Sequence, residues 1–378
     1  MIVPAIPGPY TGFREKPPLV HSASMPENEK PPALYGGMAV VEGVMMRSPG
    51  YFSVACRAPN GDIVVKTEPV EKSWIGRQKW LMKPFLRGTF AMLDTMAFGI
   101  RAMDFAAKVQ TRPDLAAPGD VPVKPTNSKA DAAMIAGTIV FSLLFGFFLF
   151  NAVPQFAAEF VTRLITGDGA KNRHLLLTNY VAEIVKLIFI IAYLWGISFL
   201  PSIRDLFRYH GAEHKAINAM EHEKPLEPRA VQEETRLHPR CGTNFVIIVF
   251  VVSFLLQPLI PRDLFVPADS PGWLIAVSRL PVELAMMPVI AGISYELIRL
   301  AGRMRNQAWV KFALAPGLAT QLITTAEPTI PQIEVAIEAL EAAKHAEETG
   351  DCRNGLRSLG YVETHPVDNA QPAEDALA

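Results

Sequence analysis

The sequence predicts a mainly α-helical membrane protein of about four transmembrane helices, with a small cytoplasmic β unit near the N-terminus. Three observations lead to this fold class. Hydrophobic residues make up 50% of the 378 residues, and charged residues only 19%. Mean hydropathy is +0.19, which is high for a soluble protein. Four segments are also apolar over enough residues to cross a bilayer core of roughly 30 Å.

The N-terminal region is predicted to be a disordered lead followed by a β unit. Residues 1–33 are rich in proline and poor in large apolar side chains, so we expect them to be disordered. Residues 34–130 follow as a cytoplasmic unit. Its first apolar run contains one acid, Glu42, either on the outward face of a strand or beside a ligand. Further on, Asn60-Gly61 between two apolar runs is typical of a β-hairpin, because both turn positions need positive φ. We predict two or three strands.

The rest of this unit is predicted to be a helix and a linker. Large apolar side chains recur between residues 80 and 108, but four charges interrupt them: Arg87, Asp94, Arg101 and Asp104. Charges this frequent disfavour a transmembrane span and favour an interfacial amphipathic helix, at the membrane surface or against the bundle. Several prolines in residues 111–130 then indicate a linker.

Residues 131–310 are predicted to form a four-helix membrane domain. Its spans are expected at residues 132–158, 175–200, 243–260 and 273–298. In the second span, Glu183 and Lys186 are three residues apart and can pair on one helix face. The fourth span contains Glu283 and Glu296, and its continuous apolar part is short.

The distribution of Lys and Arg predicts how these spans are oriented. The connection between the second and third spans holds seven basic residues: Arg204, Arg208, Lys215, Lys224, Arg229, Arg236 and Arg240. The connection between the third and fourth spans holds only Arg262. Basic residues are enriched on the cytoplasmic side of membrane proteins. We therefore expect both termini and the longer connection to be cytoplasmic.

The C-terminal region is predicted to be a helix and a tail. Residues 311–350 should contain a cytoplasmic helix, because Ile333, Ile337 and Leu340 recur at helical spacing. Residues 351–378 are expected to be a disordered tail. The net charge of −1 creates no field that attracts nucleic acid. The four predicted spans make the lipid bilayer the expected partner. Three scattered cysteines do not make a disulfide framework and indicate reduced thiols.

The candidate site lies in the cytoplasmic loop at residues 201–242. His210 and His214 are one helical turn apart, so both imidazoles lie on one face and can reach the same cation, with Glu213 beside them. The order H-x-x-E-H occurs in metallopeptidases, where the two His bind zinc and the Glu acts as base. His238 and Cys241 add an imidazole and a thiol at a spacing typical of metal ligands. We predict His210, His214, His238 and Cys241 as metal ligands and Glu213 as the catalytic base.

The number of ligands decides between a structural and a catalytic metal. If all four predicted ligands bind, the tetrahedral shell is closed and the site is structural. If one is free, water can occupy the open position and Glu213 can take its proton. The expected cofactor is a divalent metal ion, zinc by its ligands, whereas two His and a carboxylate with open positions would suit iron. The remaining alternative is a set of scattered histidines that bind no metal.

Four motifs carry a resemblance to a known family. They are YGGMAVVEGVMMR at residues 35–47, YHGAEHK at 209–215, HPRCGT at 238–243 and PGLATQ at 316–321. Together they resemble the YqhQ-like proteins, and the resemblance runs from about residue 35 to residue 340. It implies a multi-pass protein of a bacterial inner membrane, of unknown function and described as a predicted metal-dependent enzyme.

Three functions are compatible with these observations. The first is a membrane-bound metal-dependent enzyme, a hydrolase with Glu213 as base. The second is a non-enzymatic membrane scaffold or assembly factor that uses the metal as a structural clamp. The third is a transporter, because four ionisable residues lie within spans, unless they lie near helix ends and extend to the lipid headgroups: Glu183, Lys186, Glu283 and Glu296. The sequence indicates neither the substrate nor a protein partner.

Overall fold

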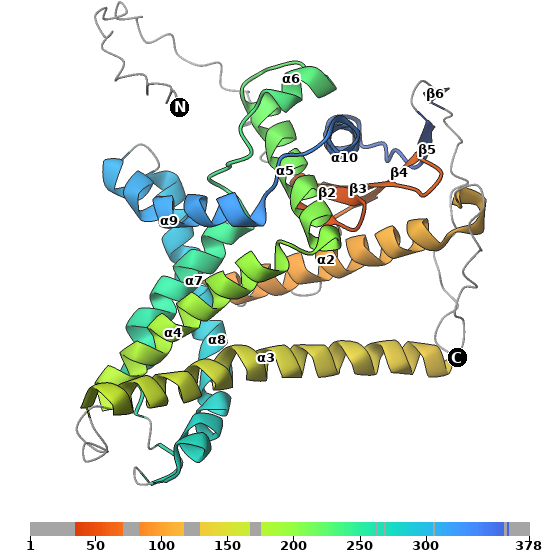
Figure 1. The fold of residues 1–378 in the computed structure, drawn as a ribbon. Helices are drawn as coiled ribbons and strands as arrows, with labels where there is room; N and C mark the ends of the chain where they lie inside the picture. The colour runs from red at the N-terminus through yellow and green to blue at the C-terminus, as the bar shows by residue number, and fades with distance from the viewer. Residues whose placement is uncertain are drawn as a thin grey trace, which may run out of the picture. The chain divides into compact units, whose positions relative to one another are not determined.

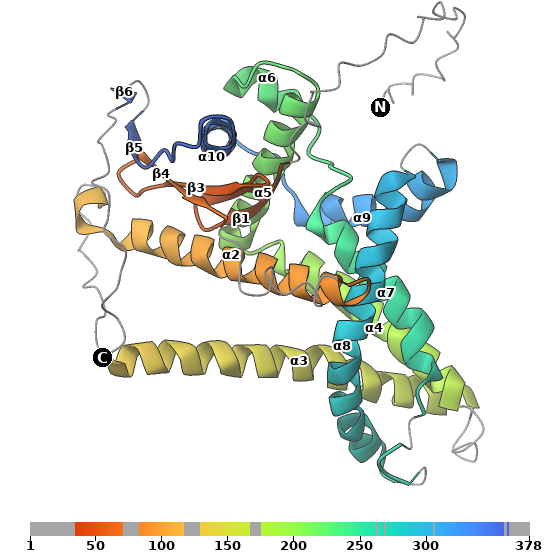
Figure 2. The ribbon, with the colours of Figure 1, turned by 180° about the vertical axis from the view of Figure 1, so that it is seen from behind.

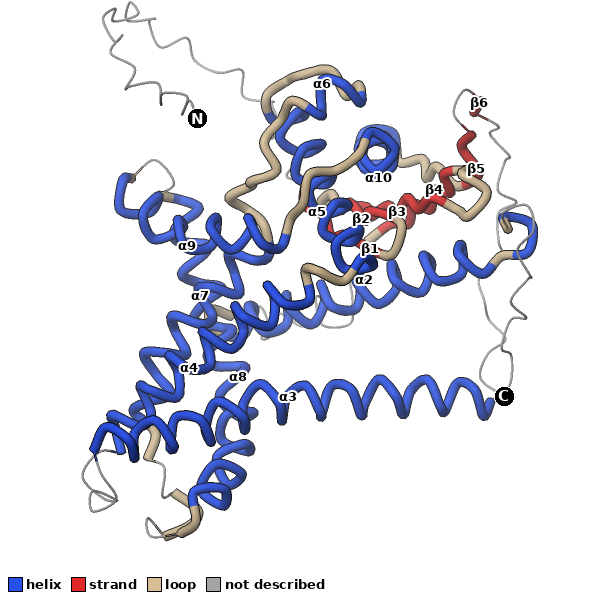
Figure 3. Tube along the Cα trace, viewed as in Figure 1, coloured by secondary structure: helices blue, strands red, loops and turns tan. Residues whose placement is uncertain are grey.

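The computed structural model describes residues 35–70, 83–116, 129–166, 175–261, 264–267, 270–304, 307–358 and 361–362. Most of these residues are helical, and the strands form one antiparallel sheet (Figure 3). The predicted fold class is therefore confirmed. The predicted disordered lead at residues 1–33 lies outside the described residues, as does most of the predicted linker.

The sheet is built from both ends of the chain. Four consecutive strands form an antiparallel meander: β1 Gly36–Val40, β2 Gly43–Arg47, β3 Tyr51–Arg57 and β4 Ile63–Pro69. The hairpin predicted at Asn60-Gly61 joins β3 to β4, and Gly61 has φ 98°. The meander has four strands where the sequence predicted two or three. β5 Gly355–Ser358 then pairs with β4 from within the predicted tail, and β6 Tyr361–Val362 pairs with β5.

Two helices cover the two faces of this sheet. α2 Leu86–Thr111 lies on one face and α10 Ile330–Thr349 on the other (Figures 1 and 2). β3 explains the double cover, because side chains on both its faces are buried. Phe52 points toward α2, where its ring centroid lies 5.0 Å from that of Phe98. The next residue, Ser53, points toward α10 and donates its hydroxyl hydrogen bond to Ala339 O. Alternation along the strand thus places a core on each side.

The predicted amphipathic helix is α2, and its apolar residues serve two faces. Phe98, Ala102 and Ala106 are buried in the core with the sheet. Met96 and Ile100 remain exposed, by 48% and 68%. Placement of that second face at a membrane surface remains a prediction. At its N-terminal end α2 is fixed to α8 by the ion pair of Arg87 with Glu296.

Within the part of the chain that the structure describes, four helices are long and apolar enough to cross a membrane. They are α3 Lys129–Thr166, α4 Leu175–Ile197, α7 Gly242–Leu256 and α8 Gly272–Arg303. The apolar windows run over Val140–Thr162, Leu177–Ile197, Gly242–Leu259 and Val277–Ala301. Each window overlaps one of the four predicted spans, so the chain is a membrane protein.

Ionisable residues of the spans meet inside this helix bundle. Lys186 Nζ lies 3.3 Å from Glu183 Oε1 and 3.7 Å from Glu283 Oε2. Gln155 on α3 donates a hydrogen bond to Glu283 Oε1 at 2.8 Å, and Arg279 lies 3.9 Å from the same carboxylate. The predicted Glu183–Lys186 pair is confirmed. The alternative that these groups extend to the headgroups is wrong for Glu183, Lys186 and Glu283, because all three are buried. The remaining acid, Glu296, pairs with Arg87.

Candidate metal centre

The predicted metal helix is α5 Pro201–Glu221, which begins just after α4 ends. Leu200 is its N-cap without a side-chain hydrogen bond, and Pro201 occupies the first helical turn, where its fixed φ suits a helix start. The second half of α5 is buried, including Glu213 and His214.

Gly211 has a packing reason that the sequence did not show. A Cβ at this position would lie 2.2 Å from Ala326 O, so only glycine lets the segment after α9 pass so close to α5. α9 Ala308–Thr324 ends at this segment, and Ala326 N donates to Phe207 O at 2.9 Å. The close approach places the Thr324 carbonyl beside the His210 ring.

Backbone carbonyls fix the tautomers of both α5 histidines. His210 Nδ1 lies 2.9 Å from Thr324 O, and His214 Nδ1 lies 2.6 Å from Arg236 O. A carbonyl oxygen can only accept, so Nδ1 is the protonated nitrogen in each ring. Each Nε2 therefore carries a free lone pair in the neutral state. Metal-binding histidines are usually oriented in this way.

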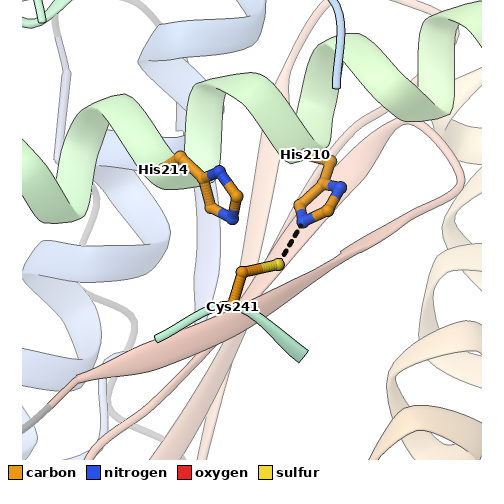
Figure 4. Close-up of side chains that lie close together, drawn as sticks. All are labelled: His210, His214 and Cys241. Carbon is orange, nitrogen blue, oxygen red and sulfur yellow. Dashed lines mark hydrogen bonds between the residues drawn. The ribbon is translucent and has the colours of Figure 1, made fainter. Parts of the chain in front are cut away.

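The two Nε2 atoms converge with the thiol of Cys241 (Figure 4). His210 Nε2 lies 3.2 Å from Cys241 Sγ, and one ligand atom from each of the three residues lies within 4.8 Å of the others. Cys241 is the N-cap of α7, where Sγ accepts from Thr243 N at 3.5 Å and from Thr243 Oγ1 at 3.4 Å. The sulfur therefore lies at the N-terminal end of a helix, which is the positive end of its dipole.

These residues fit a divalent cation. His214 Nε2 is buried and has no hydrogen-bond partner among the described residues. A buried lone pair of this kind costs free energy unless something binds it. Two imidazole nitrogens and one thiolate form a donor set typical of zinc. No other His, Cys, Asp or Glu among the described residues joins this group.

The fourth predicted ligand, His238, lies beside this group but outside it. Its ring centroid is 5.7 Å from that of His214, and its Nε2 lies 3.6 Å from Glu221 Oε1. Burial, with a smaller contribution from the charge of His214, lowers the pKa of His238 to about 4. The ring is thus neutral at physiological pH.

Gln321 is a site residue that sequence reasoning missed, although it ends the fourth family motif. It is fully buried on α9. Its Oε1 accepts from His238 N and its Nε2 donates to His238 O, both at 2.9 Å. The Gln321 side chain thereby satisfies both the backbone N–H and the backbone carbonyl of His238. The amide holds the segment that leads from His238 to Cys241.

The predicted catalytic base, Glu213, faces the sheet side of the centre. Its Oε2 is 4.0 Å from His210 Nε2, is buried, and has no hydrogen-bond partner among the described residues. Burial raises the pKa of Glu213 to about 7, against smaller opposing effects of the His210 charge and a hydrogen bond from the Gly37 backbone. A carboxyl group with this pKa can exchange a proton near neutral pH.

The first family motif meets the second at α5. Gly37 on β1 lies against Glu213, since a Cβ there would be 2.9 Å from the Glu213 side chain and 2.5 Å from Met45 O. Glu42 was predicted on a strand face or beside a ligand. It occupies the turn between β1 and β2 with φ 49°, and its Oε2 accepts from the Tyr209 hydroxyl at 3.1 Å. The β1–β2 hairpin thus contacts the helix that carries both histidines.

Comparisons with known proteins agree with the four motifs. The family model described as "Protein of unknown function (DUF1385)" matches residues 83–346. The chain is 33% identical over 320 residues to the "Uncharacterized protein YqhQ" of Bacillus subtilis (strain 168), covering 83% of this chain and 93% of the relative. No solved structure gives a significant match. The chain therefore belongs to the YqhQ-like DUF1385 family, whose function is unknown.

Proposed function

We propose that this protein is a membrane-bound, metal-dependent hydrolase. It would bind a divalent cation through His210, His214 and Cys241. Two imidazole nitrogens and one sulfur are donor atoms that favour zinc. One observation carries the proposal. The Nδ1 atoms of His210 and His214 are hydrogen-bonded to backbone carbonyls, so their Nε2 atoms are free to face the Cys241 thiol. No fourth His, Cys, Asp or Glu among the described residues joins this group. Three protein ligands with an open position are typical of catalytic zinc.

The surrounding residues supply the remaining chemistry. A bound cation would provide Lewis-acid polarisation of a substrate oxygen or of water. Glu213 would accept the proton of the attacking water at Oε2 and return it to the leaving group. Its position, 4.0 Å from His210 Nε2, and its raised pKa support this role. Gly37 donates to the carboxylate and orients it.

The charge distribution supports a cytoplasmic active site. Seven basic residues lie on the connection that carries α5 and Cys241: Arg204, Arg208, Lys215, Lys224, Arg229, Arg236 and Arg240. By the positive-inside rule, this side of the bacterial inner membrane and both chain ends would be cytoplasmic. Substrates would then come from the cytoplasm or from the inner leaflet.

Metal content and turnover test the proposal separately. Purified protein should contain one zinc per chain, and His210→Ala, His214→Ala and Cys241→Ala should each lose it. His238→Gln should keep the metal, since His238 lies outside the group. Glu213→Gln should bind metal like the wild type and fail in a cellular complementation assay. Wild-type complementation by Glu213→Gln would exclude the role as base.

A structural metal is the second candidate, in a non-enzymatic scaffold or assembly factor. His238 favours it, because its buried Nε2 also has no hydrogen-bond partner among the described residues. A small rotation of the loop could bring this nitrogen to the fourth position and close the shell. In that case His238→Gln should lower metal affinity together with the other three ligand variants, and Glu213→Gln should complement fully.

A further inference from the structure

A cavity lies at the start of α5, where this helix follows the apolar helix α4. It has a volume of about 480 Å³ and lies between the end of α4, the start of α5 and the end of α9. Six of its lining residues matter for its chemistry: Trp195, Phe199, Arg204, Phe207, Arg236 and Leu322. None of them belongs to the proposed metal ligands.

One wall of this cavity continues the surface of a membrane span. The apolar window of α4 ends at Ile197, which lies in the sequence between the lining residues Trp195 and Ser198. Trp195, Phe199 and Leu322 are exposed by 59%, 66% and 56%. Trp195 and Phe199 pack edge to face with ring centroids 5.0 Å apart. Exposed aromatic side chains at the end of a span are typical of the zone where acyl chains meet headgroups.

The cavity is also lined by two guanidinium groups that have no carboxylate partner among the described residues. The side chain of Arg204 is exposed and makes no ion pair or hydrogen bond with the described residues. Arg236 donates to Thr325 O, a neutral acceptor. Glu327 is the acid at this cavity, and Lys215 Nζ already binds it at 2.7 Å. The cavity therefore has a net positive charge beside an apolar wall.

We propose that this cavity binds an anionic phospholipid. Arg204 and Arg236 would bind the headgroup phosphate, and the acyl chains would lie along the exposed apolar residues of α4 and α9. A soluble phosphate compound would leave that apolar wall in water, and a zwitterionic lipid would leave the second guanidinium without a partner. The inference does not depend on the proposed metal. It does place the lipid next to Arg236, whose backbone carbonyl orients His214.

Native mass spectrometry of the detergent-solubilised full chain tests this site. The probes are phosphatidylglycerol, phosphatidylcholine with the same acyl chains, and glycerol 3-phosphate. Wild type should retain phosphatidylglycerol more tightly than phosphatidylcholine. Arg204→Gln and Arg236→Gln should each weaken phosphatidylglycerol binding about fivefold, which corresponds to one basic residue near an anionic lipid. Leu322→Gln should weaken binding of the lipid and leave that of glycerol 3-phosphate unchanged.

Arg208→Gln is the matched control. Arg208 lies one turn along α5, is paired with Asp205 at 2.7 Å, and does not line the cavity. Arg204 is exposed, so its replacement should leave the fold intact, as circular dichroism can verify. Equal retention of the two lipids would overturn the proposal. So would equal effects of Arg204→Gln and Arg208→Gln, or binding of glycerol 3-phosphate as tight as that of the lipid.

Discussion

His210 Nε2 lies 3.2 Å from Cys241 Sγ, which joins two residues 31 positions apart in the sequence. The first residue lies on α5 and the second at the start of α7, so the contact closes the whole connection between two spans. Hydrogen bonds from three pairs of residues hold this connection closed: His210 with Thr324 O, His214 with Arg236 O and His238 with the Gln321 side chain.

Gly211→Ala should destabilise the protein and weaken metal binding. The new Cβ would lie 2.2 Å from Ala326 O, so α5 and the segment after α9 must separate. Overpacking of this kind costs about 1–3 kcal/mol of unfolding free energy, and the Thr324 carbonyl would move away from His210. Gly196→Ala is the control, because nothing lies within 4 Å of its Cβ position. Thermal unfolding in detergent and metal titration measure the two effects, and equal stability of the two variants would contradict this account.

Gln321→Leu should release the His238 segment. The variant leaves the His238 N–H and carbonyl without their present partner, and each buried unsatisfied group costs about 1–3 kcal/mol. The loop that carries Cys241 should then loosen, so metal should dissociate faster. The rate of metal transfer to a chromogenic chelator gives the measurement. Gln307→Leu is the control, since Gln307 is exposed at the start of the same helix, and it should dissociate metal like the wild type.

Glu283→Gln should strongly destabilise the helix bundle. The substitution leaves Lys186 and Arg279 with Glu183 as their only carboxylate in this network of described residues. Breaking a buried ion pair in this way costs about 3–5 kcal/mol. The double variant Lys186→Met, Glu283→Gln restores the charge balance and should recover part of the loss. Midpoints of thermal unfolding in detergent decide the matter. If the double variant is less stable than the single one, charge balance is not what holds these helices.

The stability of the metal-free protein should depend on the protonation of Glu213. Its pKa is raised from 4.5 to about 7 in the folded state, so the unfolded chain releases this proton at lower pH than the folded chain. Glu213 therefore makes the unfolding free energy fall as pH rises from about 4.5 to 7, by about 3 kcal/mol in total. His238, with its lowered pKa, acts in the opposite direction over a similar range.

The contribution of Glu213 is therefore measured as a difference. Denaturant unfolding of the chelator-treated wild type and of Glu213→Gln should be compared at pH 5 and pH 7. The wild type should lose stability relative to the variant between these values, because only the wild type carries the titrating carboxyl. Parallel pH profiles would show that Glu213 does not titrate in this range.

Local sequence signals predicted much of this architecture. Asn60-Gly61 is a local signal that predicted the hairpin, although only Gly61 of the pair has positive φ and the loop spans residues 58–62. The four spans followed from length and apolar composition. The spacing of His210 and His214 placed both on one helix face for the same local reason. Contacts between residues that are far apart in the sequence were not predicted. Nothing local marks Thr324 and Arg236 as the carbonyls that orient the rings, because every residue has a backbone carbonyl.

Pairing across the chain was equally hidden from the sequence. The segment around Leu356 was predicted as tail, yet it pairs with Val64 of β4. A strand of four residues has too little pattern of its own to identify it. For Gly37, the sequence likewise showed only a glycine within an apolar run. Its contact with Glu213 depends on how β1 approaches α5, which only the folded chain determines.

The covering of the sheet by α10 has a consequence for biosynthesis. The ribosome makes the meander strands first, at residues 36–69, but the helix that covers one of their faces begins at Ile330. All four apolar helices must therefore be translated while that face is bare. A chain stalled during membrane insertion would expose β-strands in aqueous solution, and we expect chaperones to associate with nascent chains of this length.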